Sequence, residues 1–175
     1  MKHIMFDLET MGMAPDGAIA SIGAIRFDPF GTELSDPFYV VVDIAGQEKE
    51  FRRTISGDTV LWWMQQEEAA RNELFRGDRI PLPAALKQFA DYVGASSVPT
   101  WAYPSTFDHV VLHSAYRAAG LKPPIHYRDE LCMRGIAKMA KVECPHHPGV
   151  AHNALADAER QARWLQAILA AKWIK

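Results

Sequence analysis

The chain has 175 residues, 49% of them hydrophobic and 23% charged, with a formal net charge of −2 and a pI near 6.4. This length and composition fit a single globular domain over residues 1–175 with a sizeable core. The weak net charge argues against a protein that coats nucleic acid non-specifically, but not against an enzyme that meets phosphates through metal ions. Two cysteines, no apolar run of membrane-spanning length and an acid at position 7 favour a cytoplasmic protein without a membrane segment.

The first predicted element is a short strand that carries two acidic residues. It leads from residues 2–5 into Phe6-Asp7-Leu8-Glu9-Thr10. Side chains alternate along a strand, so Asp7 and Glu9 are expected on the same face. Neither has a Lys or Arg beside it in the sequence, and carboxylates at this spacing suit Mg²⁺ or Mn²⁺. The alternative is a pair of solvated acids on an edge strand.

The first half of the chain then changes from strands to helices. Apolar and β-branched runs separated by short turns predict two more strands, at 18–27 and 38–42, which complete an antiparallel three-strand meander. Helical spacing follows over 56–64, continues over 67–75, and returns from Pro83 to Gly94.

In the second half, strands and helices alternate. We expect strands at 98–103 and 125–129, helices at 104–120 and 130–140, a loop at 144–149 and a final helix capped by Asn153. A meander followed by such alternation predicts an α/β fold, with one mixed sheet and helices on both faces.

The final helix is apolar around much of its circumference, at Trp164, Leu165, Ile168 and Leu169 among others. A helix that is hydrophobic on more than one face must be covered. Burial in the core of the same chain and burial in a homodimer interface both remain open.

Three more residues bear chemistry. Asp108 lies in the first turn of a predicted helix, His152 lies in a loop, and Asp157 lies one turn into the final helix. Each has an ordinary explanation on its own, since acids favour helix N-termini and histidines are common in loops. Together with Asp7 and Glu9 they supply four carboxylates and one imidazole.

The order of these residues resembles the DEDDh-type 3′–5′ exonucleases of the RNase H-like fold, a group that includes polymerase proofreading domains, RNase T and oligoribonuclease. Residues 6–10 resemble the first motif, the helix with Asp108 the second, and His152 with Asp157 the third. The similarity extends from Met1 to about Leu169. Within the family, residues 59–65 resemble a compact phage and bacterial subgroup that includes phage exonuclease A.

The resemblance implies a metal-dependent exonuclease that shortens RNA and/or single-stranded DNA from the 3′ end, as short strands or overhangs, and releases nucleoside 5′-monophosphates. It implies two divalent ions, Mg²⁺ or Mn²⁺, held by Asp7, Glu9, Asp108 and Asp157. His152 would take the proton from the attacking water. The alternatives are a small-nucleotide or cap hydrolase on the same metal core and a catalytically silent nucleic-acid-binding scaffold; the complete set of five residues argues against the scaffold.

Five residues are candidates for binding substrate. By resemblance, Thr10 and Met11 would line the pocket of the terminal nucleotide. Trp62 and Trp63 are neighbours on a helix and point about 100° apart, so one is expected in the core and the other against a substrate base. Phe107, beside Asp108, is expected to form a wall of the site. The choice between RNA and DNA stays open.

The run Cys144-Pro145-His146-His147 contains metal-binding residue types but lacks the four spaced ligands of a structural zinc site. We expect it to form the loop that carries His152 into place.

Overall fold

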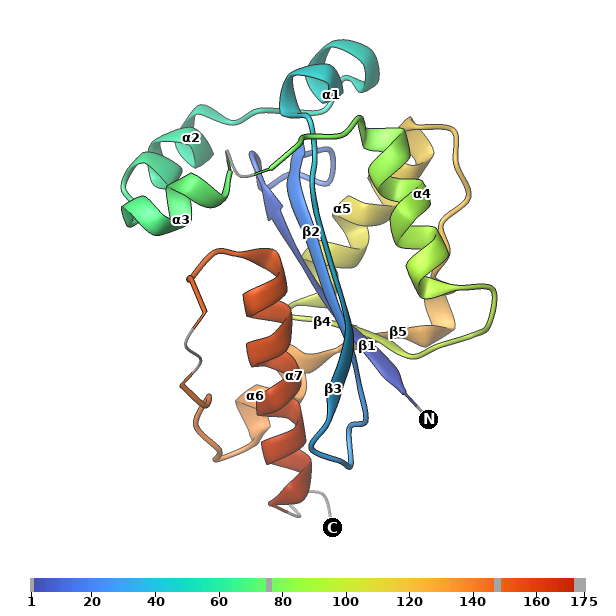
Figure 1. The fold of residues 1–175 in the computed structure, drawn as a ribbon, viewed down its shortest axis with the longest axis vertical. Helices are drawn as coiled ribbons and strands as arrows, with labels where there is room; N and C mark the ends of the chain where they lie inside the picture. Colours follow the sequence, from blue (N-terminus) through green and yellow to red (C-terminus); the bar gives the residue numbers. More distant parts are fainter. Residues whose placement is uncertain (1, 75–76, 147–148, 172–175) are drawn as a thin grey trace.

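The computed structural model describes residues 2–74, 77–146 and 149–171 (Figure 1). Its strands form a mixed sheet in the order β3-β2-β1-β4-β5. β1 pairs antiparallel with β2, β2 pairs antiparallel with β3, and β4 and β5 add in parallel, which confirms the meander and the mixed sheet. The bounds are β1 His3–Thr10, β2 Ile19–Phe27, β3 Leu34–Val41, β4 Thr100–Ala102 and β5 Glu130–Cys132.

The acid-bearing strand β1 is the central strand of this sheet, so Asp7 and Glu9 do not lie on an edge. On its β4 side, β1 pairs only through Ile4 and Met5. The half of β1 with the acids therefore extends past the end of β4.

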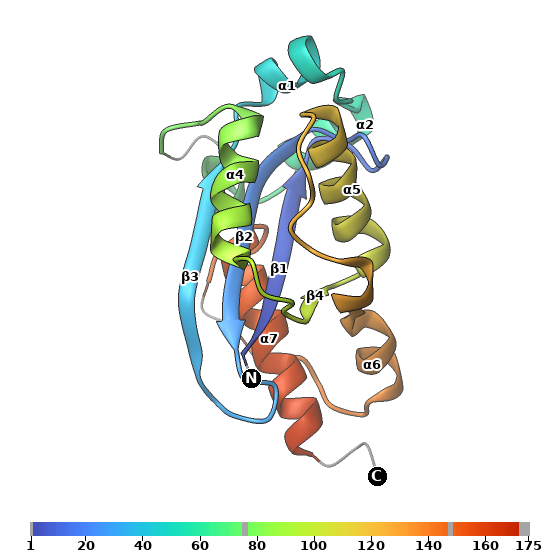
Figure 2. The same cartoon turned by 90° about the vertical axis from the view of Figure 1, so that its right-hand side faces the viewer.

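Helices cover both faces of the sheet, as Figures 1 and 2 show. α4 (Leu82–Val93) and α5 (Ser105–Ala118) pack on one face against Ile4, Phe6 and Leu8. α6 (Met133–Met139) and α7 (Ala154–Ala170) pack on the other face, where Met5 lies in the core. The predicted alternation along β1 is thus confirmed. At one end of the sheet, near the C-terminal end of β1, lie α1 (Ile44–Phe51), α2 (Gly57–Met64) and α3 (Glu68–Glu73).

The predicted strand at 125–129 is wrong. Residues Tyr127–Asp129 form a 3₁₀ helix, in which the Asp129 amide donates to the His126 carbonyl at 2.8 Å. The strand begins directly after Asp129, as β5, where Leu131 pairs with Trp101. The local turn satisfies its own backbone groups, so the β-prone side chains do not join the sheet there.

α1 was not predicted, because its sequence is mostly polar. Asp43 caps it by accepting a hydrogen bond from the Gly46 amide at 3.0 Å. Gln47, fully buried, both donates to and accepts from the backbone of Ile19, at 2.7 and 2.9 Å. A polar residue therefore attaches this helix to β2, a contact that apolar periodicity does not reveal.

The apolar residues of α7 are covered within the chain. Leu165 and Ile168 are fully buried against Phe27 and Met133, and Trp164 and Leu169 pack at the margin of this core. The homodimer stays a prediction. Among the described residues, no helix combines the length and apolar character needed to cross a lipid bilayer. The end of the predicted helix at Phe75, and His147 in the predicted loop, lie outside the described residues.

Candidate active site

The site begins on the face of β1 that looks towards α7. Asp7 is half-buried and accepts a hydrogen bond from the Gln161 side chain of α7 at 2.8 Å. Across the sheet Asp7 pairs with Gly23 of β2. A Cβ at Gly23 would overlap the backbone of Ala154 and Leu155, so the glycine is what lets the start of α7 approach the sheet.

Asp108 lies on α5, which covers the opposite face of the sheet, and its side chain contacts the same strand. Its side chain is 2% exposed and accepts a hydrogen bond from the Leu8 amide at 3.2 Å. That amide is available because β4 stops pairing with β1 after Met5. The short β4 thus brings the acid of the second predicted motif to the acids of the first.

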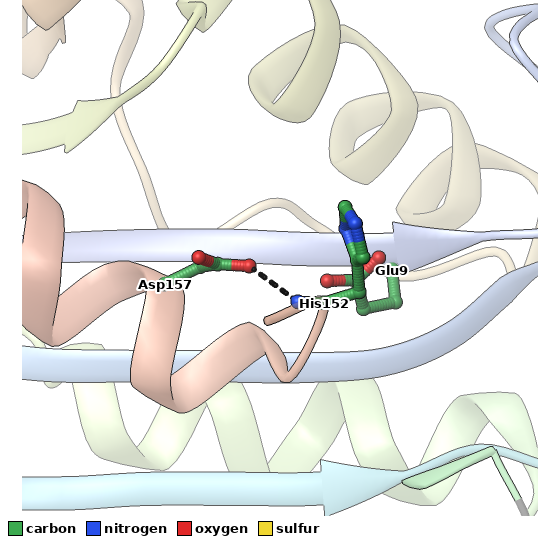
Figure 3. A group of neighbouring side chains, drawn as sticks. All are labelled: Glu9, His152 and Asp157. Carbon is green, nitrogen blue, oxygen red and sulfur yellow. Dashed lines mark hydrogen bonds between the residues drawn. The ribbon is translucent and has the colours of Figure 1, made fainter. Parts of the chain in front are cut away.

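His152 and Asp157 come from the turn before α7 and from its first turn. The His152 amide donates to Asp157 at 3.1 Å (Figure 3). His152 has a φ of 61°, in the left-handed region that few non-glycine residues adopt. Asn153 then caps α7, as predicted, by accepting from the Ala156 amide at 3.0 Å.

Glu9, His152 and Asp157 form a compact group of potential ligands. One ligand atom from each lies within 4.8 Å of the others. Figure 3 shows the His152 ring beside Glu9, with the Asp157 carboxylate directed at the His152 backbone. Glu9 and Asp157 are each 8% exposed. The five residues of the three predicted motifs are therefore brought to one end of β1, although they span most of the sequence.

Burial, together with the repulsion among neighbouring carboxylates, shifts the proton affinities of the acids. Burial raises the pKa of Asp7 well above its usual value, and the carboxylates of Asp108, Glu9 and Asp157 raise it further. Burial, followed by the charge of Asp157, raises the pKa of Glu9 to about 8. Burial also raises the pKa of Asp108 to about 7, against the hydrogen bond from Leu8. For Asp108, the positive charge of Arg134 offsets only part of this effect.

A divalent cation fits the residues present. Asp157 has a cationic partner in Arg160, whose Nη2 lies 2.5 Å from its Oδ1. The buried Oε1 of Gln161, next to Asp7, has no hydrogen-bond partner among the described residues. Carboxylate oxygens with one imidazole are ligands suited to Mg²⁺ or Mn²⁺, and a bound cation would offset the repulsion among the acids.

A pocket of about 320 Å³ opens beside the acids. Thr10, Trp62 and Phe107, all expected at substrate, are among its lining residues. Trp62 is 42% exposed, whereas Trp63 is 3% exposed and donates its indole N–H to the Thr10 carbonyl at 3.0 Å. The pair divides as predicted into one core and one pocket residue.

Met11 does not line this pocket. It packs in a small core with Trp63, Ala18 and Ala20, and Met13 contributes to the pocket instead. A β-bulge between Glu9 and Thr10 interrupts the alternation of side chains just before Met11.

Sequence reasoning missed several other residues at the site. Asp58 and Thr59, at the start of α2, line the pocket, and Arg160 and Gln161 contact the acids from α7. Arg160 and Gln161 had a usable signal, because they follow Asp157 by three and four residues and so share its helix face.

The fold is similar to that of solved exonucleases. E. coli exonuclease I bound to a dT13 oligonucleotide matches with a TM-score of 0.70 at 15% identity, over 98% of this chain and 41% of that one. The nuclease domain of 3′hExo, a DEDDh family member bound to rAMP, matches with a TM-score of 0.66 at 16% identity, over 96% and 91%. Exonuclease I of Methylocaldum szegediense matches with a TM-score of 0.61 at 14% identity, over 92% of this chain and 38% of that one. The chain thus spans about two fifths of the exonuclease I chains.

No curated protein matches the chain in sequence. A family model, described as the 3′–5′ exoribonuclease Rv2179c-like domain, matches residues 2–169. That match covers nearly all of the described fold, including the acids and the histidine at the end of β1. The chain belongs to the Rv2179c-like family of 3′–5′ exoribonuclease domains.

Proposed function

We propose that this chain is a metal-dependent 3′–5′ exonuclease that removes nucleoside 5′-monophosphates from the 3′ end of a single strand. The carrying observation is the group of Glu9, His152 and Asp157, whose ligand atoms lie within 4.8 Å of one another beside a pocket. The family description favours RNA as substrate, and single-stranded DNA is the second candidate. The proposed compartment is the cytoplasm, where Cys132 and Cys144 stay as free thiols.

In this proposal, Asp7, Glu9, Asp108 and Asp157 hold two divalent ions, Mg²⁺ or Mn²⁺. Bound ions would supply Lewis-acid activation of water, charge relief at the phosphate and support for the leaving 3′-oxygen. The acids suit this role because burial, and then mutual repulsion, raise their pKa values, and bound cations would stabilise their ionised forms.

His152 is the proposed general base. Its imidazole lies next to Glu9, and its backbone is fixed by Asp157, so the ring stays at the site. An imidazole titrates near neutral pH and can take the proton of the attacking water without extreme tuning.

The pocket next to the acids is the proposed seat of the terminal nucleotide. Trp62 and Phe107 offer aromatic surfaces to a base, and Thr10 lies beside Glu9. Stacking on aromatic side chains tolerates any base, at about 1–3 kcal/mol per base. This suits an exonuclease that must accept each successive 3′ end.

The test is a time course on 5′-labelled RNA and DNA of one sequence, with Mg²⁺, Mn²⁺ or EDTA. We expect a ladder that shortens from the 3′ end, only with metal, and faster on RNA. Asp7→Asn, which keeps the shape of the side chain, is expected to stop it. Absence of shortening with either metal, or full activity of Asp7→Asn, would overturn the proposal.

A further inference from the structure

Trp62 borders both the pocket and the histidine. Its ring lines the pocket together with Thr59 and Phe107. The centre of the same ring lies 4.8 Å from that of the His152 imidazole, with the planes at 79°. A base that enters the pocket would therefore touch the side chain that touches the imidazole.

The backbone and the side chain of His152 are held by different elements. The backbone is attached to Asp157 of α7 through its amide. The imidazole has edge-to-face contacts with Trp62 and, at 6.0 Å, with Trp63, both on α2. Trp63 is buried and donates a hydrogen bond to the Thr10 carbonyl, so its position is fixed. The ring of Trp62 packs against it, with the two ring centres 5.1 Å apart. Among Trp62, Trp63 and His152, Trp62 is the most exposed residue.

A second contact ties the same two parts together. Glu73, at the end of α3, accepts a hydrogen bond from the Asn153 side chain at 2.7 Å. Glu73 is 8% exposed, and Asn153 directly follows His152. The α2–α3 segment thus contacts the turn before α7 at two points, which are the imidazole of His152 and the side chain of Asn153.

We propose that Trp62 is a positioning residue that couples occupancy of the pocket to the orientation of His152. A stacked 3′-terminal base fixes the Trp62 ring, and that ring fixes the imidazole in the orientation that accepts the proton. The terminal base therefore contributes to turnover as well as to binding. This inference rests on the proposed function, because it concerns the same site.

The test combines a change in the enzyme with a change in the substrate. Wild type, Trp62→Phe and Trp62→Ala are compared on oligonucleotides of equal length that end in a normal or an abasic 3′ nucleotide. In wild type, loss of the 3′-terminal nucleobase is expected to lower kcat about tenfold, because a small misplacement of a reacting group slows the reaction strongly. In Trp62→Ala, kcat is expected to be low on both substrates, and loss of the nucleobase should change it little further. Trp62→Phe keeps a ring and is expected to restore most of the dependence.

A role in binding alone predicts a different result. Loss of the nucleobase would then raise KM and leave kcat unchanged. Alternatively, the effects of nucleobase removal and of Trp62→Ala on kcat would be independent and would multiply. Either result overturns the inference. Leu61→Ala, a change at a 59% exposed neighbour on α2 that does not line the pocket, should behave as wild type on both substrates. If wild type degrades neither substrate with metal, the proposed function itself has failed.

The hydrogen bond between α3 and the histidine turn gives a second variant pair. Glu73→Ala removes the acceptor, whereas Glu73→Gln keeps an oxygen that can accept from Asn153. We expect kcat to fall about fivefold in Glu73→Ala and to recover in Glu73→Gln, as for a group that orients another. Equal kcat values in all three proteins would remove Glu73 from the inference.

A readout independent of catalysis is the proton resonance of the His152 ring, which the Trp62 ring current displaces. Adenosine 5′-monophosphate added with Mg²⁺ should shift this resonance in wild type, and ribose 5-phosphate should shift it much less. The difference should vanish in Trp62→Ala. Equal shifts by both compounds in wild type would contradict the coupling.

Discussion

The side-chain nitrogen of Gln161 lies 2.8 Å from a carboxylate oxygen of Asp7, so the last helix holds an acid of the first strand. Such a donor stabilises the ionised carboxylate, and it lowers the pKa that burial raises. The contact also fixes which way the Asp7 carboxylate turns. It joins residues 154 positions apart in the sequence.

Gln161→Leu should therefore weaken metal binding. Loss of an outer-shell partner typically costs about 10–100-fold in metal affinity. We expect that loss in titration calorimetry with Mn²⁺, and exonuclease activity that recovers at high metal concentration. Gln166→Leu is the matched control, because Gln166 is a buried glutamine of the same helix that donates to the Asp28 carbonyl, away from the acids. Equal metal affinity of the two variants would contradict a role of Gln161 in holding Asp7.

Gly23→Ala should disturb the site, although Gly23 has no side chain that could bind a metal ion or transfer a proton. A Cβ there would overlap backbone atoms of Ala154 and Leu155, so the start of α7 must move away from β2. His152 and Asp157 would move with it, and a displacement of about 1 Å can cost on the order of 100-fold in rate. Activity and thermal unfolding of the variant measure the effect.

Gly57→Ala is the control for that substitution, since a Cβ at Gly57 meets no atom within 4 Å. Alanine is favoured over glycine in a helix, so this change should leave activity intact and not lower stability. A Gly23→Ala protein as active as Gly57→Ala would show that α7 does not need this close approach.

The sequence predicts the parts of this molecule that depend on local patterns. Alternation placed Asp7 and Glu9 on one face of β1, and Asn153 was identified as the cap of α7 from residue type and position. Contacts between distant segments carry no such pattern. The hydrogen bond from Asn153 to Glu73 joins residues 80 positions apart, and the sequence around either residue does not predict it.

Local irregularities explain the remaining errors. Met11, expected at the pocket by resemblance, lies in a small core just after the bulge, and Met13 lies at the pocket. α1 is capped by Asp43 and attached to β2 by the buried Gln47, and the hydrophobic pattern shows neither contact. Each error falls where a polar contact or an extra residue replaces regular periodicity.

His152→Asn should abolish turnover without unfolding the protein. The left-handed φ of 61° suits asparagine better than most residues, and the backbone bond to Asp157 does not need the imidazole. Removal of a general base costs about 10²–10⁴-fold in rate. We expect that loss in single-turnover assays, together with a thermal unfolding temperature close to that of wild type.

His152→Ala tests the backbone argument. It also loses the base, but alanine pays about 1–2 kcal/mol for the left-handed conformation. The alanine variant should thus be the less stable of the two by urea denaturation. If His152→Asn kept more than half of wild-type turnover, His152 would not be the base.

The metal-free protein should lose stability as the pH rises from about 4 to 8. Glu9 has its pKa raised to about 8 and Asp108 to about 7 in the folded chain, whereas unfolded carboxylates titrate near 4. The folded state therefore binds protons more tightly than the unfolded state. The stability that these groups contribute is present at low pH and is lost as the pH passes through their folded pKa values.

Thermal unfolding in EDTA across this pH range measures the effect, and saturating Mg²⁺ should reduce it because the cation replaces the protons. Glu9→Gln removes one charge from the group. At pH 8 without metal it should be more stable than wild type by ~1–3 kcal/mol, and Mg²⁺ should stabilise it much less. A matched exposed change, Glu48→Gln on α1, should alter neither property. If Glu9→Gln destabilised the metal-free protein at pH 8, repulsion among the acids could not be the reason for the proposed binding of a cation.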